Sequence, residues 1–431
     1  MTRIAAHTLV IPGLLAGGLL LATPAHADPQ VDGVYSVADI GTNNLIAPGP
    51  DGNMWVTLNG ATDEVARISP SGQVDRFDIT GVTNPVGITA TGGLMWITYA
   101  GGVASFNPTG VTSPVTPTTV AIAALTDPRG IVPGPDGNLW TASMDKVFRI
   151  VPGPPAVVTE FATAVTKVKD AKAIAAGGDG TIWVADGNGG AQVVSVAVDG
   201  TGTAYPTGGG NQGIAAGPGD QMGYSNPLAN PQNVGRIQPG GTPQTTETAQ
   251  LDPFGVTFGA DGAYWFAQFN GRNLGRLTSD GGYTTLSGFP AAGAAPRQLA
   301  AGPSDTLWVT LDYPGTPTET KVARVTGVSP APPPVTPDTT ITKAPKAKVY
   351  TAKKKVALTF RFESSVSDST FQCKWFKRIK GEEPPKATWK SCASPRTYQS
   401  KPGKYTLKVR AAAGGLTDPS PPKRTVKVMR S

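Results

Sequence analysis

A short apolar run centred on a tryptophan recurs through most of this sequence at an almost constant spacing. The best-preserved copies follow a Gly-Pro-Asp-Gly-Asn turn, at residues 49–53 and 134–138. The positions concerned are Trp55, Trp96, Trp140, Trp183, Gly223, Trp265 and Trp308. They lie 41, 44, 43, 40, 42 and 43 residues apart. A period near forty residues with turn residues in every unit is typical of a β-propeller with four-stranded blades.

Each unit is predicted to contain strands a, b, c and d, with the tryptophan on strand b. In the first unit these are residues 44–47, 54–57, 64–68 and 73–79. The seventh unit offers only three strands, residues 298–300, 306–311 and 321–326. A lone strand at residues 34–40 can supply the fourth and close the ring, which removes the open sheet edges. The sequence therefore predicts a seven-bladed β-propeller over residues 28–328.

Composition supports an all-β chain. The sequence holds 54 glycines and 41 prolines among short Val, Ile and Thr runs, and no stretch after residue 30 shows sustained helical periodicity. Each strand-b tryptophan is expected to pack between neighbouring blades rather than to stack on a ligand.

The first 27 residues, 1–27, have the features of a secretory signal peptide. Arg3 stands in a short charged start, residues 9–22 are apolar, and residues 25–27 read Ala-His-Ala. A retained membrane anchor is the alternative, but the apolar run is shorter than the roughly 20 residues that span a bilayer. We expect export, a secreted or envelope-associated protein, and no transmembrane segment after cleavage.

A proline-rich linker at residues 329–338 precedes a last module, residues 339–431. Its predicted strands are residues 355–362, 371–376, 404–412 and 424–429. The segments 371–373, 389–392 and 405–411 resemble bacterial immunoglobulin-like (Ig-like) modules at the ends of secreted proteins. The resemblance implies a small C-terminal β-sandwich and no common activity.

The only two cysteines, Cys373 and Cys392, lie in this module. In an oxidising compartment such a pair most simply forms one disulfide. A metal-binding or catalytic role lacks partners, because the only histidines, His7 and His26, belong to the predicted signal peptide.

Charge is distributed unevenly along the chain. Residues 28–337 hold 14 Lys and Arg against 24 Asp and Glu, a net charge of −10, whereas residues 338–431 hold 22 against 6, a net charge of +16. An acidic propeller region joined to a basic C-terminal module gives information about binding partners rather than about the fold. We expect the basic module to contact an anionic cell-envelope polymer or lipid headgroups, with solubility alone as the alternative. Nucleic acid would suit the same charge, but the predicted export argues against it.

In an up-and-down propeller the d-to-a and b-to-c connections share one face, and ligand sites are expected there at the channel mouth. The residues entering strand a are Val86, Arg129, Lys172, Gln212, Phe254 and Arg297. The residues that lie three positions after each tryptophan position are Leu58, Tyr99, Ser143, Asp186, Asn226, Gln268 and Leu311.

The repeats resemble one known family. Residues 128–131 with 134–140, and residues 265–268 with 273–278, are similar to the streptogramin B lyases, also called virginiamycin B lyases. The resemblance covers the propeller. In that family a Pro-His-Gly/Ala-Ile motif supplies histidines and a Trp-Phe-x-Glu motif supplies glutamates around a magnesium ion. The resemblance therefore implies an enzyme in which these groups together open a cyclic ester by elimination.

This sequence departs from both motifs. No strand-a position holds histidine, and the glutamate position never holds Glu, with Asp186 as its only acid. Without histidine the usual proton-transfer group near neutral pH is missing. Without convergent carboxylates a hard divalent ion lacks ligands. We therefore predict no catalytic residues, no metal ion and no cofactor.

Three cations leave the predicted mouth positive. They are Arg129, Lys172 and Arg297, with Asp186 as a counter-charge and Gln268 in the glutamate position. We hypothesise that these five residues bind an anionic small molecule, peptide or glycan; ordinary solvated rim charges are the alternative.

The sequence thus predicts a secreted, non-catalytic propeller that binds a ligand or protein partner and is tethered by its basic module. A streptogramin-lyase-like or lactonase-like enzyme acting at the same mouth is the alternative, and a purely structural surface protein is a third hypothesis.

Overall fold

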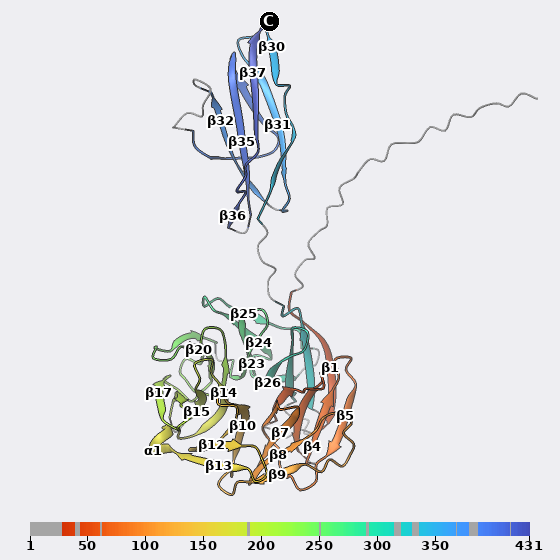
Figure 1. Cartoon of the computed structure of the whole chain (residues 1–431), viewed down its shortest axis with the longest axis vertical. Coiled ribbons are helices and arrows are strands. Elements are labelled where there is room, and N and C mark those ends of the chain that lie inside the picture. The colour runs from red at the N-terminus through yellow and green to blue at the C-terminus, as the bar shows by residue number, and fades with distance from the viewer. Residues whose placement is uncertain are drawn as a thin grey trace, which may run out of the picture. The chain divides into compact units, whose positions relative to one another are not determined.

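The computed structural model describes residues 28–38, 44–60, 63–187, 190–249, 251–289, 293–313, 320–329, 336–367, 369–378, 387–413 and 415–431. The predicted signal peptide and residues 330–335 of the predicted linker lie outside these ranges. The chain forms two compact units that divide between residues 331 and 332. Apart from one short helix, α1 (Thr163–Thr166), the regular structure of the described residues is β (Figure 1). Within those residues no helix is long and apolar enough to cross a membrane.

The first unit is a propeller of seven four-stranded antiparallel sheets, as the repeat predicts (Figure 1). Blades 1 and 2 contain β2 (Ile46–Pro48), β3 (Met54–Asn59), β4 (Asp63–Ile68), β5 (Val74–Asp78), β6 (Ile88–Thr91), β7 (Leu94–Tyr99), β8 (Gly102–Phe106) and β9 (Thr118–Ala121). Blades 3 and 4 contain β10 (Pro128–Pro133), β11 (Leu139–Ser143), β12 (Lys146–Val151), β13 (Val157–Ala162), β14 (Ala171–Ala176), β15 (Ile182–Asp186), β16 (Gln192–Val196) and β17 (Gly202–Pro206). Blades 5 and 6 contain β18 (Gly213–Ala216), β19 (Met222–Asn226), β20 (Asn233–Ile237), β21 (Gln244–Glu247), β22 (Pro253–Phe258), β23 (Ala263–Gln268), β24 (Asn273–Thr278) and β25 (Tyr283–Leu286).

Blade 7 joins the two ends of the propeller, which confirms the predicted closure. It contains β26 (Ala295–Gly302), β27 (Thr306–Asp312), β28 (Thr320–Thr326) and, as its outermost strand, β1 (Gln30–Ala38). β1 begins earlier than the predicted residues 34–40 because it pairs along the whole of β28, with Gln30 opposite Thr326. Residues 39 and 40 lie outside the described part of the chain.

The closing strand is fixed by a cluster around Arg324 of β28. Arg324 Nε lies 2.8 Å from Asp32 Oδ1 of β1. Its guanidinium carbon also lies 6.0 Å from the ring centre of Tyr35 and 5.9 Å from that of Trp308. Tyr35 and Trp308 stack with centroids 5.6 Å apart. An ion pair, cation–π contacts and an aromatic stack therefore all hold β1 against the other strands of blade 7.

The repeated turn holds the tryptophans of blades 1, 3, 4 and 6 in their own blades. Gly52 has a φ of 79° and its N–H donates to the Gly49 carbonyl over 3.1 Å, which is the predicted turn. The Asp51 carboxylate accepts the Trp55 indole N–H at 3.1 Å. The same bond recurs as Trp140–Asp136, Trp183–Asp179 and Trp265–Asp261. A Cβ on Gly49 would lie 2.6 Å from the Trp55 ring, so only glycine fits where the indole crosses the backbone.

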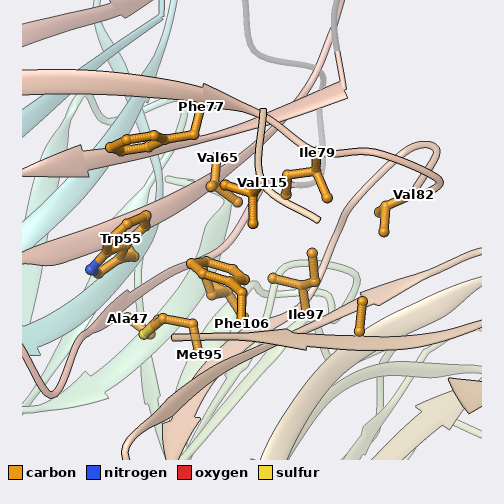
Figure 2. Packing of buried hydrophobic residues seen from close by; sticks show 12 residues of the cluster. Ala47, Trp55, Val65, Phe77, Ile79, Val82, Met95, Ile97, Phe106 and Val115 are labelled. Atoms are coloured by element: carbon orange, nitrogen blue, oxygen red, sulfur yellow. The ribbon is translucent and has the colours of Figure 1, made fainter. Parts of the chain in front are cut away.

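Figure 2 shows how a strand-b tryptophan fills the space between two blades. Trp55 of β3 stacks on Phe77 of β5 with ring centroids 5.6 Å apart, and it meets Phe106 of β8 edge-on at 5.4 Å. Met95 and Ile97 of β7 belong to the same buried cluster. The packing role predicted for the tryptophans is therefore the one that Trp55 has.

Blade 5 has no tryptophan, and a side chain from blade 6 fills its place. A Cβ added to Gly223 of β19 would lie 2.3 Å from the ring of Tyr264 on β23. The Tyr264 hydroxyl donates to the Gln221 carbonyl at 2.8 Å, and burial raises its pKa, so it remains a neutral donor. Gly223 thus provides the space that the neighbouring tyrosine occupies.

The turn aspartate of blade 3 carries a pH-dependent part of the stability. Burial raises the pKa of Asp136, but hydrogen bonds from Asn138, Trp140 and Arg149 outweigh it and lower the pKa from 3.8 to about 2. The Asp136 side chain is only 13% exposed, so this lowering of its pKa contributes roughly 2 kcal/mol to the free energy of unfolding. The contribution is present above about pH 4 and is lost as the pH falls towards 2.

We expect Asp136→Asn to lower the unfolding free energy near neutral pH by roughly 2 kcal/mol, and this difference to shrink as the solution is acidified. Urea denaturation of both proteins at several pH values measures it. A difference that stays constant down to the acid limit would contradict the assignment.

The second unit consists of two facing sheets, as the predicted sandwich requires. The smaller has the order β29 (Thr339–Lys343), β31 (Val356–Ser364) and β34 (Arg396–Ser400). The larger has the order β30 (Lys348–Thr351), β37 (Lys423–Arg430), β35 (Gly403–Ala413), β32 (Thr370–Lys377) and β33 (Lys390–Cys392), with β36 (Leu416–Thr417) paired to β35. Both sheets contribute to one buried cluster that includes Phe360, Leu407 and Val426. The parallel pairing of β30 with β37 makes the larger sheet mixed.

The predicted disulfide between Cys373 and Cys392 is present. It joins neighbouring strands of one sheet, since Phe371 on β32 lies opposite Cys392 on β33. The bridge of antibody domains joins the two sheets instead. Here the disulfide therefore fixes the edge strand β33 to its own sheet.

Candidate functional site

The first strand of each blade faces the propeller axis, and the seven form a closed ring. Contacts run from β2 through β6, β10, β14, β18, β22 and β26 back to β2. These strands enclose a cavity of ≈ 220 Å³. Each blade contributes at least one branched apolar side chain to its wall, and these include Ile46, Ile88, Ile131, Ile174, Ile214, Val256 and Leu299. Among the described residues, the charged side chains of this wall are Arg129 and Lys172.

Arg129 and Lys172 reach the cavity as ion pairs, each with the aspartate two positions earlier. Arg129 Nη2 lies 2.5 Å from Asp127 Oδ2, and Lys172 Nζ lies 2.7 Å from Asp170 Oδ1. Both cationic side chains are 21% exposed. The two aspartates therefore balance much of the positive charge that Arg129 and Lys172 bring to the cavity. Sequence reasoning missed the two aspartates, although the shared Asp-x-Arg/Lys spacing could have revealed them.

The residues three places after the tryptophan position hold these aspartates in place. Ser143 Oγ accepts the Asp127 backbone N–H at 3.0 Å. Asp186 Oδ1 accepts the Asp170 backbone N–H at 2.7 Å. Both blades therefore use the end of strand b to fix the segment that leads into strand a.

Asp186 is fully buried and does not belong to the cavity wall. Its carboxylate also accepts the Lys169 N–H at 3.2 Å and the Gln192 side-chain amide at 2.9 Å. Burial raises the pKa of Asp186, and these hydrogen bonds oppose the rise. The geometry gives Asp186 an indirect part in the site, because it holds the segment that carries Asp170 and Lys172.

Gln268 is likewise fully buried, away from the cavity wall. Its side-chain amide donates to the Tyr283 hydroxyl at 2.6 Å. The equivalent Asn226 is also fully buried and donates to the Thr207 carbonyl at 3.1 Å. In both blades this position is therefore buried inside the propeller and hydrogen-bonded there.

Arg297 covers an aromatic pair instead of lining the cavity. Its guanidinium carbon lies 4.8 Å from the ring centre of Phe254 and 5.5 Å from that of Phe269. Arg297 Nε lies 3.5 Å from Asp312 Oδ2. Of the five residues predicted to bind a ligand, the structure thus brings Arg129 and Lys172 together at the cavity and places the other three outside its wall.

One donor beside the cavity lacks a partner. Arg129 Nε is buried, and no described residue accepts a hydrogen bond from it. A buried N–H without an acceptor costs about 1–3 kcal/mol. In the described part of the chain, no group of three His, Cys, Asp or Glu side chains is placed to hold a metal ion.

Comparison with known proteins agrees with the fold. The profile of the Virginiamycin B lyase family matches residues 158–329, from β13 to the end of the propeller. No curated protein matches the chain.

Several solved structures share the architecture. A streptogramin B lyase structure is 17% identical with a TM-score of 0.57, over 70% of this chain and 99% of that one. Virginiamycin B lyase from Staphylococcus aureus is 19% identical with a TM-score of 0.57, over 68% and 99%. The extracellular domain of a hybrid two-component system from B. thetaiotaomicron is 12% identical with a TM-score of 0.51, over 92% and 56%. At these identities the likeness shows the fold, a propeller of the virginiamycin B lyase type.

Proposed function

We propose that the propeller is a non-catalytic binding protein that holds a small ligand through an anionic group at the mouth of its channel. The observation that carries this proposal is the Arg129 guanidinium, which lines the cavity, is held by Asp127 at Nη2 and belongs to a side chain that is 21% exposed. Guanidinium nitrogens present parallel donors that match a carboxylate. Lys172 offers a second cation in the same wall.

The apolar wall sets the expected size and character of the ligand. Ile131 and Ile174 lie in the same wall as the two cations and would contact the apolar part of a bound molecule. The cavity of ≈ 220 Å³ is smaller than the roughly 300–1,000 Å³ of drug-sized pockets. A small acid, a peptide carboxyl end or one acidic sugar unit fits this combination.

A binding role is supported by the residues available for chemistry. The chain has no histidine after residue 26, and histidine is the commonest proton-transfer group near neutral pH. Asp186, the acid of the glutamate position, is buried and already accepts hydrogen bonds from the residues around it.

We further propose that the protein is exported, as its first 27 residues indicate, and that the basic second unit tethers it to an anionic cell-envelope polymer. The net charge of +16 over residues 338–431 supports this second part.

Replacing both wall cations should weaken ligand capture strongly. We expect Arg129→Gln with Lys172→Gln to weaken binding of glucuronate and of the tripeptide Ala-Ala-Ala by about a hundredfold or more, since charge-assisted hydrogen bonds contribute roughly 1.5–3 kcal/mol each. Titration calorimetry on the full chain measures the affinities.

The matched control is Lys167→Gln with Arg272→Gln, which removes the same charge from exposed positions of the propeller. It should bind both probes as the unchanged protein does. Equal binding by the two double variants, or no binding of either probe by the unchanged protein, would reject the proposal.

A lyase or lactonase acting at the same mouth is the second candidate. The profile match over residues 158–329 and the likeness to streptogramin B lyases favour it. Incubation with cyclic depsipeptides and lactones, with and without magnesium, followed by mass spectrometry, would reveal ring opening. Turnover would replace the binding proposal, and magnesium dependence would indicate the family's chemistry.

A further inference from the structure

One position on the innermost strands of the propeller is not the same size in every blade. It directly precedes the branched residue that lies opposite the residue after the tryptophan position, as Leu299 lies opposite Val309. Five blades hold glycine or alanine at this preceding position, and the other two hold Leu45 and Gln298. The small residues are Gly87, Gly130, Ala173, Gly213 and Gly255. Leu45 and Gln298 both line the axial cavity, so these two side chains make its wall asymmetric.

A bulge lets Gln298 face the cavity. The pairing of β26 with β27 shifts register between Pro296 and Leu299, and a bulge of this kind re-aims a side chain. Gln298 and Leu299 are consecutive residues, yet both belong to the cavity wall. The Gln298 backbone N–H donates to Thr310 Oγ1 of β27 at 3.0 Å. The neighbouring strand therefore fixes the backbone of Gln298 while its side chain lies at the cavity.

The side-chain amide of Gln298 is accessible to a ligand. Gln298 is partly exposed, and its hydrogen bonds with the described residues are made by its backbone groups. A Cβ added to Gly255 would lie 2.6 Å from Gln298 Oε1, so the side chain lies against a glycine of blade 6 that leaves room for it. A glutamine amide offers both an acceptor and donors. This is the combination that pairs with another amide group.

Gln298 and the two wall cations lie on opposite sides of the channel. The innermost strands follow one another around a closed ring in the order β2, β6, β10, β14, β18, β22 and β26. Arg129 belongs to β10 and Lys172 to β14, and these are the two strands farthest from β26 around the ring. A ligand whose carboxylate meets the cations therefore presents its next polar group across the channel towards Gln298.

We propose that Gln298 makes the axial cavity specific for the carboxyl end of a peptide, by pairing with the amide group next to the bound carboxylate. The inference deepens the proposed function and rests on it. Among the ligands that fit the cavity, a peptide end combines a carboxylate with an amide a few bonds away. A simple acid lacks the amide, and a uronic acid offers hydroxyls instead. A site built to hydrogen-bond a polar group rejects an analogue that lacks it.

Titration calorimetry of the full chain with two matched probes tests the proposal. N-acetyl-alanine carries a carboxylate and one amide, and 2-methylpentanoate has the same chain length without the amide. We expect the unchanged protein to bind N-acetyl-alanine about tenfold more tightly, since the amide pair replaces one or two neutral hydrogen bonds with water. Gln298→Met keeps an unbranched side chain and should remove this preference, while its affinity for 2-methylpentanoate stays within about twofold.

Two further variants complete the experiment. Gln298→Ala introduces the residue that blade 4 holds at the equivalent position, Ala173, and should also lose the preference; it serves as the second variant if methionine rearranges the wall. Gln212→Met is the matched control, because Gln212 directly precedes β18 and lies outside the cavity wall that the described residues form. The control should keep the preference of the unchanged protein.

The outcomes separate this inference from the proposed function. If the unchanged protein binds neither probe, the binding function and the inference both fail. If it binds both probes equally, the cavity takes an anion, but the role of Gln298 is rejected. A preference that survives both substitutions of Gln298 would also reject that role. Tighter binding of glucuronate than of N-acetyl-alanine would overturn the choice of a peptide.

Discussion

A chain without residues 28–38 should lose about 5 kcal/mol or more of unfolding free energy, because each buried apolar side chain contributes roughly 1.5–3 kcal/mol. The deletion removes β1 and with it the outer strand of blade 7. Val37 is buried, and Val31 and Val34 pack against the core of blade 7. Since whole domains are stable by only about 5–15 kcal/mol, most of the propeller should unfold at moderate urea concentrations.

Urea denaturation followed by circular dichroism measures this loss. A more conservative version is Tyr35→Ala, which removes the stacking on Trp308 and the contact with Arg324. Ser36→Ala serves as the control, because Ser36 is exposed on the same strand. If the shortened chain were as stable as the full one, blade 7 would not depend on β1.

Trp140→Ala is expected to lower the unfolding free energy by about 3–5 kcal/mol, the usual cost of truncating a large buried aromatic side chain. Trp140 is fully buried and stacks on Phe161 with ring centroids 5.6 Å apart. The substitution also removes the donor of the 2.9 Å bond to Asp136. Thermal and urea unfolding of the purified variant measure the effect.

Trp140→Phe separates packing from hydrogen bonding. It keeps an aromatic ring but lacks the indole N–H, so its cost should be clearly smaller than that of alanine. It should also raise the pKa of Asp136, because the Trp140 bond is one of the contacts that lower it. Equal costs for the two substitutions would show that the ring itself contributes little.

The sequence was sufficient to predict the architecture because the signals for it are local and repeated. A glycine-containing turn followed by a tryptophan recurs in six of the seven units, and the missing fourth strand of the last unit matches the spare strand at the start. The observed contacts explain why the pattern is so regular. Gly49 must be small because the Trp55 ring crosses it, and Asp51 accepts the indole N–H.

Blade 5 shows what a single repeat cannot reveal. Gly223 reads as a lost tryptophan, but the space is filled by Tyr264 from the following blade. Such compensation depends on contacts between residues about forty positions apart. No spacing rule within one repeat predicts it.

The candidate site was predicted only in part, for a related reason. The repeat gives the position of a residue along its strand, but not whether loops cover it. Arg129 and Lys172 line the cavity, whereas Asp186 and Gln268, at the ends of their strands, are fully buried outside its wall. The prediction also gave the cations Asp186 as their counter-charge and did not pair them with the aspartates two residues earlier.

The pairing of β1 with β28 also has a consequence for how the protein assembles. Arg324 meets Asp32 across 292 positions of the chain. Contacts of such long range form slowly, and β1 has no partner until β28 has been synthesised. Until then blade 7 presents an unpaired strand edge, which favours aggregation. The last propeller strand to be made is thus the one that completes the ring, and the time between synthesis and closure is when the chain is most vulnerable.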